Sequence, residues 1–239
     1  MTPRKGGAIS AAMPSSPQTS PVIKICGLST AATLEAALEV RADMVGFVFF
    51  APSPRHVSFA QARELAARVE SRALKVALSV DADDAMLAQM IEALHPDILQ
   101  LHGKETPQRI SEIKSRFALP VMKAIHISEV ADLAAIAEFE SVADRLLFDA
   151  RPPKGALLPG GNGAAFDWTI LDGVRCARPW MLSGGLNPGN VEEALRVTRA
   201  PGLDVSSGVE SAPGVKDAAL IRDFVARARR ALGSPAKAG

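Results

Sequence analysis

The sequence predicts an α/β protein with a single (β/α)8 TIM barrel. Three observations lead there: strand-like and helix-like segments alternate, about eight such pairs fit into 239 residues, and polar residues gather where the strand-like runs end. Alternating strands and helices are typical of a parallel sheet, and eight units in a chain of about this length are typical of a closed barrel. An open, doubly wound sheet is the alternative, but no G-x-G-x-x-G motif follows the first strand.

Each expected strand is a short apolar run, and each expected helix between them carries apolar residues at three- and four-residue spacing. The strands are residues 22–26, 44–50, 74–80, 97–102, 120–127, 145–150, 179–185 and 202–208. The helices are residues 30–41, 58–70, 83–94, 106–117, 129–139, a short 165–171, 190–199 and 217–232. We therefore expect one barrel domain over residues 22–232.

The two ends of the chain lack such patterns. Residues 1–21 are rich in proline, serine and glycine and lack the apolar centre of a signal peptide, so we expect a disordered tail. Arg4 and Lys5, with no acidic residue nearby, leave a transit peptide as a weaker alternative, and Met13 offers a later start codon. We expect residues 233–239 to be a frayed end.

The composition argues against several classes of function. A net charge of +1 does not steer the molecule toward nucleic acid or an anionic membrane, and no apolar run approaches the roughly 18 residues of a spanning helix. Aromatic residues make up only 5% and tyrosine is absent, which weakens any base-stacking surface. Two cysteines argue against a disulfide framework and suit a reducing compartment. We expect a cytoplasmic protein that acts on a small molecule, as a monomer or a homodimer.

Two glycine-rich strand ends predict a phosphate site. They are Ser183, Gly184 and Gly185 after the seventh strand, and Ser206, Ser207 and Gly208 after the eighth. Small residues let backbone N–H groups approach an anion, and TIM barrels commonly bind phosphate at this position. Two turns that merely need glycine are the alternative. A phosphorylated substrate follows from the first interpretation.

The sequence resembles the phosphoribosylanthranilate isomerase family in several motifs that occur in the right order. These are KICGL, GFVFFAPSPRHVS, LQLHG, LLFDA followed by PGGNGAAFDW, LSGGLNPGNV, and DVSSGVE with PGVKD. The resemblance covers nearly the whole chain from Val22 to the last helix. It implies an isomerase of tryptophan biosynthesis that needs no cofactor or metal. The reaction is the Amadori rearrangement of N-(5-phosphoribosyl)anthranilate to 1-(2-carboxyphenylamino)-1-deoxyribulose 5-phosphate.

The resemblance also implies catalytic roles, with Cys26 as general base and Asp149 as general acid. The acid protonates the ribose ring oxygen so that the ring opens to an iminium, and the base then removes the proton from C2′. A thiol is a competent base near neutral pH only if its pKa falls below about 8.5. Lys24 lies two residues before Cys26 on the same strand face, so we expect it to lower that pKa.

Other polar residues are assigned to substrate binding or to the scaffold. Arg55 is expected to hold the anthranilate carboxylate, mainly on the family resemblance. His102 either hydrogen-bonds substrate or is structural. We place Lys123 and Asp204 on inward faces of their strands, in a charged network with Lys24 that is a structural candidate. The turn at residues 151–163 is a candidate lid, and Cys176 lies at the opposite barrel end from Cys26.

Three other interpretations remain open. A metal-dependent sugar-phosphate epimerase would share the barrel and the phosphate site, but it needs histidines and carboxylates at strand ends, and we expect only His102 there. An isomerase of the histidine pathway would share the rearrangement, with a carboxylate in place of Cys26. A catalytically silent phosphate-binding module is disfavoured by the presence of both Cys26 and Asp149.

Overall fold

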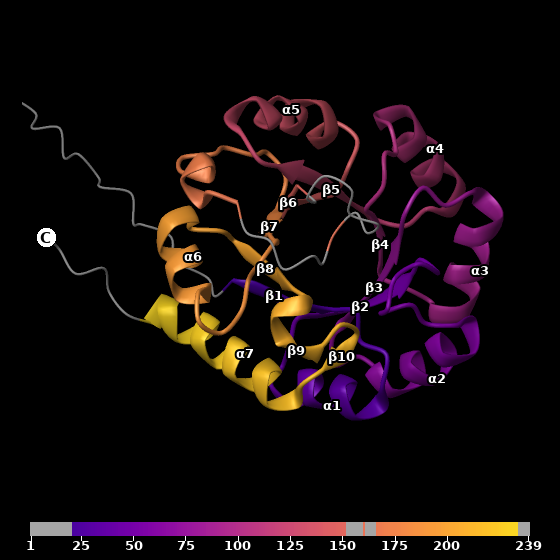
Figure 1. Cartoon of the computed structure of the whole chain (residues 1–239). Helices are drawn as coiled ribbons and strands as arrows, with labels where there is room; N and C mark the ends of the chain where they lie inside the picture. The colour runs from indigo at the N-terminus through magenta and orange to yellow at the C-terminus, as the bar shows by residue number, and fades with distance from the viewer. Residues whose placement is uncertain (1–20, 152–159, 161–165, 234–239) are drawn as a thin grey trace, which may run out of the picture.

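Eight parallel strands form a closed barrel in chain order (Figure 1). The computed structural model describes residues 21–151, residue 160 and residues 166–233. The strands are β1 (Val22–Cys26), β2 (Met44–Phe49), β3 (Leu74–Ser79), β4 (Ile98–Leu101), β5 (Val121–Ile127), β6 (Arg145–Ala150), β7 (Trp180–Leu182) and β8 (Gly202–Val205). The barrel closes because β1 pairs with both β2 and β8. The predicted fold class is confirmed.

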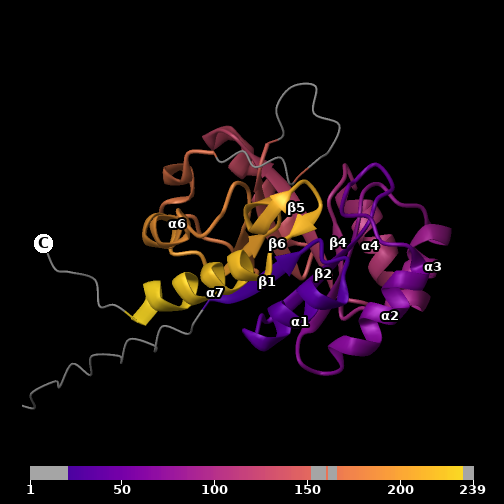
Figure 2. The same ribbon diagram turned by 60° about the horizontal axis from the view of Figure 1, so that its bottom comes forward.

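Seven α-helices in the described part of the chain surround the barrel (Figures 1 and 2). They are α1 (Ala31–Glu39), α2 (Phe59–Val69), α3 (Asp84–Leu94), α4 (Pro107–Phe117), α5 (Ala134–Glu140), α6 (Val191–Thr198) and α7 (Ala218–Gly233). Their starts follow from the sequence: Ser58 forms a capping box with Gln61, and Thr106 caps α4 just before Pro107. None of the helices in these described ranges is long and apolar enough to cross a membrane.

Three short 3-10 helices and a hairpin complete the described chain. The 3-10 helices are η1 (Val130–Leu133), η2 (Trp168–Leu171) and η3 (Ser207–Val209). The expected helix at residues 129–139 therefore begins as η1, and the short one at 165–171 is η2. The antiparallel strands β9 (Glu210–Ala212) and β10 (Val215–Lys216) were not predicted. Nearly all of the predicted tails and of the predicted lid lie outside the described residues, although Gly233, placed in the C-terminal tail, ends α7.

Side chains fill the barrel in two layers. The larger core lies between the strands and the helices. An interior cluster fills the barrel itself, and it consists of Met44, Val76, Ile98, Met122, Ala124, Leu147 and Met181. Because successive side chains of a strand point to opposite faces, residues two or four positions after a cluster member also point inward. The inward-facing polar residues at the carboxyl ends of the strands thus lie directly above this apolar interior cluster.

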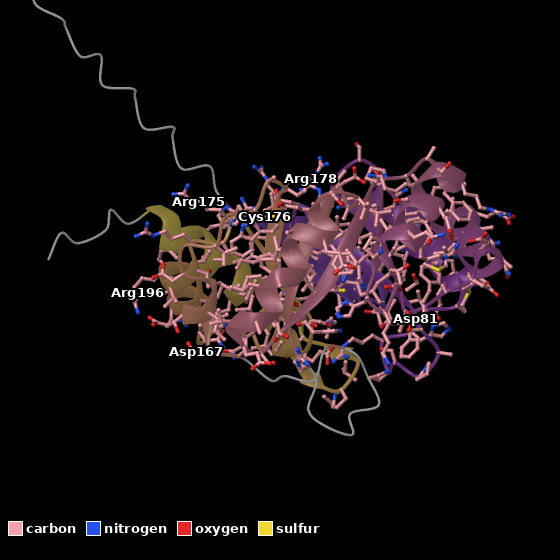
Figure 3. All side chains as sticks on the ribbon, turned by 90° about the horizontal axis from the view of Figure 1, so that it is seen from above. Asp81, Asp167, Arg175, Cys176, Arg178 and Arg196 are labelled. Carbon is pink, nitrogen blue, oxygen red and sulfur yellow. The ribbon has the colours of Figure 1, made fainter. Side chains whose placement is uncertain are left out.

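The two cysteines lie at opposite ends of the barrel. Cys26 ends β1, whereas Cys176 precedes β7. Figure 3 shows Cys176 beside Arg175 and Arg178 on the side away from Asp81 and Asp167. Neither cysteine is in a disulfide, as expected.

Candidate active site at the carboxyl ends of the strands

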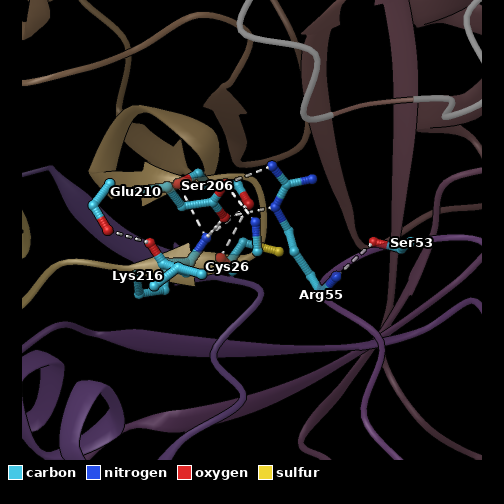
Figure 4. Close-up of polar contacts among 9 residues, drawn as sticks. Cys26, Ser53, Arg55, Ser206, Glu210 and Lys216 are labelled. Atoms are coloured by element: carbon cyan, nitrogen blue, oxygen red, sulfur yellow. Dashed lines mark hydrogen bonds and ion pairs between the residues drawn. The ribbon is translucent and has the colours of Figure 1, made fainter.

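Cys26 lies at the inner end of β1, next to a buried ion pair. Cys26 is 4% exposed, and Lys24, two residues earlier on the same face of β1, is fully buried. Nζ of Lys24 lies 2.8 Å from Oδ1 of Asp204 on β8, so these two residues form the predicted charged contact across the β1–β8 seam. The hydroxyl of Ser206 donates a hydrogen bond of 3.1 Å to the carbonyl oxygen of Cys26 (Figure 4).

Lys24 acts to lower the pKa of the Cys26 thiol, as expected, but the net shift of that pKa is upward. Burial raises the pKa of the Cys26 thiol because it disfavours the thiolate, and the nearby Asp204 carboxylate adds to that effect. Lys24 and Lys216 act in the opposite direction but do not offset burial. Sequence reasoning counted the neighbouring lysine and did not count desolvation.

Asp149 lies near the end of β6 and is held by His102, which directly follows β4. Oδ2 of Asp149 lies 3.0 Å from Nε2 of His102, and both residues are buried. The amide nitrogen of Gln100 lies 3.1 Å from Nδ1 of His102. An amide nitrogen can only donate, so Nδ1 accepts and Nε2 carries the proton that it donates to Asp149. The backbone N–H of Ala150 donates to the other carboxylate oxygen at 3.0 Å.

Gly160 lies directly against this pair. A Cβ atom at residue 160 would lie 2.6 Å from Nε2 of His102 and 2.7 Å from Oδ2 of Asp149. Both separations are too short for any side chain, so the close approach of the backbone requires glycine here.

His126 on β5 is a site residue that the sequence analysis missed. It is the last inward-facing residue of β5, and its ring centroid lies 5.6 Å from that of His102. Burial, together with the nearby His102, lowers the pKa of His126 to about 4. The expectation that only His102 ends a strand was therefore wrong. His102, His126 and Asp149 each present one potential metal-ligating atom, and these atoms lie within 4.8 Å of one another.

Arg55 lies in the loop after β2, and its side chain contacts the hairpin formed by β9 and β10. Its Nε and Nη2 donate to the two carboxylate oxygens of Glu210 on β9, at 2.7 and 2.8 Å (Figure 4). Lys216 on β10 also pairs with Glu210, and its Nζ donates to the carbonyl oxygen of Ser206 at 3.0 Å. Burial alone would raise the pKa of Glu210, but Arg55 and Lys216 lower it below its usual value. Burial lowers the pKa of Lys216.

The two predicted phosphate turns come together above β7 and β8. A Cβ at Gly208 would lie 1.8 Å from the carbonyl oxygen of Leu186, so the second turn lies against the backbone that directly follows the first. The hydroxyl of Ser183 is engaged with Oδ2 of Asp204 at 3.3 Å. Within the described residues, the backbone N–H groups of Gly184 and Gly185 donate no hydrogen bond. Such N–H groups suit an anion.

Lys123 does not belong to the charged network with Lys24, and its predicted inward orientation was wrong. Its neighbours Met122 and Ala124 belong to the interior cluster, so Lys123 points outward to the helix layer. There its Nζ lies 2.8 Å from Oε2 of Glu105 and 5.6 Å from the ring centroid of Phe139 on α5.

Comparison with known proteins gives a consistent result. The family model described as N-(5′-phosphoribosyl)anthranilate (PRA) isomerase matches residues 23–227. N-(5′-phosphoribosyl)anthranilate isomerase from Nitrobacter winogradskyi is 63% identical over 210 residues, covering 88% of this chain and 93% of the relative. Its counterpart from Rhodopseudomonas palustris strain HaA2 is 62% identical over 210 residues, covering 88% and 96%.

Solved structures are similar as well. Phosphoribosyl anthranilate isomerase from Thermotoga maritima is 31% identical, with a TM-score of 0.79, covering 88% of this chain and 99% of the other. A second match, with a TM-score of 0.75 and 30% identity, covers the same shares of both chains. That structure is a phosphoribosyl anthranilate isomerase in complex with reduced 1-(o-carboxyphenylamino)-1-deoxyribulose 5-phosphate.

Proposed function

The chain belongs to the N-(5′-phosphoribosyl)anthranilate isomerase family, and from that premise we propose that Cys26 and Asp149 perform its proton transfers. The enzyme is an isomerase of tryptophan biosynthesis. It converts N-(5-phosphoribosyl)anthranilate to 1-(2-carboxyphenylamino)-1-deoxyribulose 5-phosphate by an Amadori rearrangement. The observation that carries the proposed roles is the placement of a buried thiol and a buried carboxyl group at the ends of two separated strands, β1 and β6.

The first step is ring opening. Asp149 gives its proton to the ring oxygen of the ribosylamine as the bond from that oxygen to C1′ breaks, and the nitrogen lone pair forms an iminium at C1′. The carboxylate that remains on Asp149 is stabilised by the N–H groups of His102 and Ala150, at 3.0 Å each. His102 is therefore a positioning residue for the acid in this mechanism.

The second step is proton removal. The Cys26 thiolate takes the proton from C2′, and the electron pair of the C–H bond neutralises the iminium to give an enolamine, which tautomerises to the ketone. Burial disfavours the thiolate, while Lys24 and Lys216 favour it. We propose that these two lysines supply the electrostatic support that the base needs.

Two binding regions fit the two anionic ends of the substrate. Arg55 already holds a carboxylate in bidentate geometry, that of Glu210. We propose that the anthranilate carboxylate replaces Glu210 on Arg55, while Lys216 keeps Glu210 paired. The backbone N–H groups of Gly184 and Gly185, with the adjoining turn at Gly208, fit the phosphate. Location in the cytoplasm is part of the same proposal, because two unpaired cysteines suit a reducing compartment.

Turnover by the purified full-length chain tests the activity. We expect N-(5-phosphoribosyl)anthranilate to be consumed with loss of anthranilate fluorescence and formation of the aminodeoxyribulose phosphate. The mechanism uses only side-chain protons, so exhaustive chelation should leave the rate unchanged. Absence of turnover would overturn the proposal, whereas a chelator-sensitive rate that a divalent ion restores would favour the sugar-phosphate epimerase.

A further inference from the structure

Three neighbouring strands present metal-ligating atoms that the proposed mechanism does not need as a set. His102 follows β4, His126 lies at the end of β5, and Asp149 lies at the end of β6. These strands are adjacent in the barrel (Figure 1). We propose that His102, His126 and Asp149 bind a divalent transition-metal ion such as Zn²⁺, and that the bound ion reversibly inhibits the enzyme. The inhibitory consequence, though not the binding, depends on the proposed role of Asp149 as acid.

The ligand types and their spacing fit such an ion. Two imidazoles and one carboxylate are a common donor set for zinc, with a fourth position left open. Ligand distances of about 2.0–2.1 Å place neighbouring donors of a tetrahedral site about 3.3 Å apart. His102 Nε2 and Asp149 Oδ2 are already 3.0 Å apart, and all three donor atoms lie within 4.8 Å. The donor separations exceed that spacing by no more than about 1.5 Å, which a small shift of the side chains closes.

Two buried polar atoms support the proposal because they have no hydrogen-bond partner among the described residues. They are Nδ1 of His126 and Oε1 of Gln100. A metal ion on Nε2 of His102 moves the proton of that ring to Nδ1. A turn of the Gln100 amide then presents Oε1 as the acceptor for that proton. Metal ligation thus gives Gln100 Oε1 a partner and engages the His126 imidazole, whose Nδ1 has none among the described residues.

The charges around the site also permit a cation. Among the described residues, the cationic side chains that act on His126 are those of Lys123 and Arg151. Each is ion-paired, Lys123 with Glu105 at 2.8 Å and Arg151 with Asp132. The carboxylate of Asp149 therefore gives the three-residue site a net negative charge when ionised.

Inhibition follows because the ion would occupy Oδ2 of Asp149, the proposed acid, and the ring nitrogen of His102 that hydrogen-bonds to it. Zinc and substrate would then compete, since both need the same end of β6. The ion would also stand where the backbone of Gly160 approaches His102 and Asp149. Chelation should restore full activity, in agreement with a reaction that uses no metal.

The test is a zinc titration of the metal-free full-length enzyme, with binding measured by equilibrium dialysis and metal analysis, independently of turnover. We expect one saturable Zn²⁺ per chain and inhibition that substrate relieves. His126→Asn should weaken zinc binding at least about 10-fold. His95→Asn is the matched control, because His95 is exposed in a left-handed turn that asparagine tolerates, and its zinc affinity should equal that of the wild type.

Two further measurements keep the proposal falsifiable if His126→Asn does not fold. Co²⁺ bound to the wild type should show d–d absorption without a thiolate charge-transfer band, and Cys26→Ser should bind Zn²⁺ as tightly as the wild type. No saturable zinc at one per chain, unchanged affinity in folded His126→Asn, or loss of affinity in Cys26→Ser would overturn the site. If zinc binds as expected but phosphoribosylanthranilate is not turned over, the proposed function fails and the metal site stands.

Discussion

Replacing Asp204 by asparagine should strongly destabilise the barrel, because it leaves the charge of Lys24 buried without its partner. Lys24 is 0% exposed, and its Nζ lies 2.8 Å from the Asp204 carboxylate. At that separation and an effective dielectric constant of about 20, the Coulomb attraction is about 6 kcal/mol. Removing one member of a buried pair typically costs about 3–5 kcal/mol. In a chain of this size, each kcal/mol lowers Tm by about 2–4 °C, so Tm should fall by about 6–20 °C.

Thermal and urea unfolding followed by circular dichroism measure this effect, with two controls. Ser183→Ala removes only the 3.3 Å hydrogen bond to Asp204 and should cost about 1 kcal/mol or less. The double variant Lys24→Met with Asp204→Leu removes both charges and should lie within about 1–2 kcal/mol of the wild type.

The loss of stability in Asp204→Asn should also depend on pH, and its direction can be derived. Burial lowers the pKa of Lys24, and Asp204 offsets this in the wild type, where the pKa of Lys24 is raised. Without Asp204 the pKa of Lys24 falls. As pH rises, Lys24 in the folded variant therefore loses its proton sooner, and the unpaired buried charge disappears. The stability difference between variant and wild type should therefore narrow toward alkaline pH. A loss in the free energy of unfolding below about 1 kcal/mol at neutral pH would refute the claim that Asp204 is needed to compensate the buried charge of Lys24.

Three further predictions concern catalysis. Because burial raises the pKa of the Cys26 thiol, kcat/KM should rise as pH increases above neutral, and a profile that is flat across the alkaline range would contradict a thiolate base. Gly160→Ala should lower kcat at least about 10-fold with little change in Tm, because the new Cβ would lie 2.6 Å from Nε2 of His102 and 2.7 Å from Oδ2 of Asp149. A kcat equal to that of the wild type would show that residue 160 does not contact the acid. Arg55→Ala should raise KM about 30- to 150-fold, the equivalent of about 2–3 kcal/mol. For a ribosylamine that lacks the carboxylate, Arg55→Ala should raise KM only slightly relative to the wild type. An equal rise in KM for both substrates would show that Arg55 does not hold the carboxylate.

The parts of the site that the sequence predicted are those fixed by strand ends. Cys26 and Asp149 close apolar runs whose boundaries are clear in the sequence, and the structure places both at the carboxyl end of the barrel. The face of Lys123 was not predictable in the same way. Strand β5 is buried on both sides, so its apolar residues do not alternate with polar ones and leave the inward phase undefined.

The missed residues belong to features that short-range patterns do not record. Glu210 and Lys216 lie on strands of three and two residues, which are too short for a recognisable period, and their pairing with Arg55 joins distant parts of the chain. His126 was visible at the end of an expected strand, but its closeness to His102 depends on the neighbouring positions of β4 and β5. The raised pKa of the Cys26 thiol depends on burial, which requires the folded structure.

The turnover numbers of Cys26→Ser and Asp149→Asn test the central claim most directly. Serine is far too weak a base to replace the thiolate, and asparagine has no proton to transfer, so each variant should lose about 10²–10⁴-fold in kcat. Both variants should remain folded by circular dichroism and should bind the product phosphate ester about as tightly as the wild type, since neither residue is a proposed anion contact. A kcat near that of the wild type in either folded variant would contradict the assignment of Cys26 as base and Asp149 as acid.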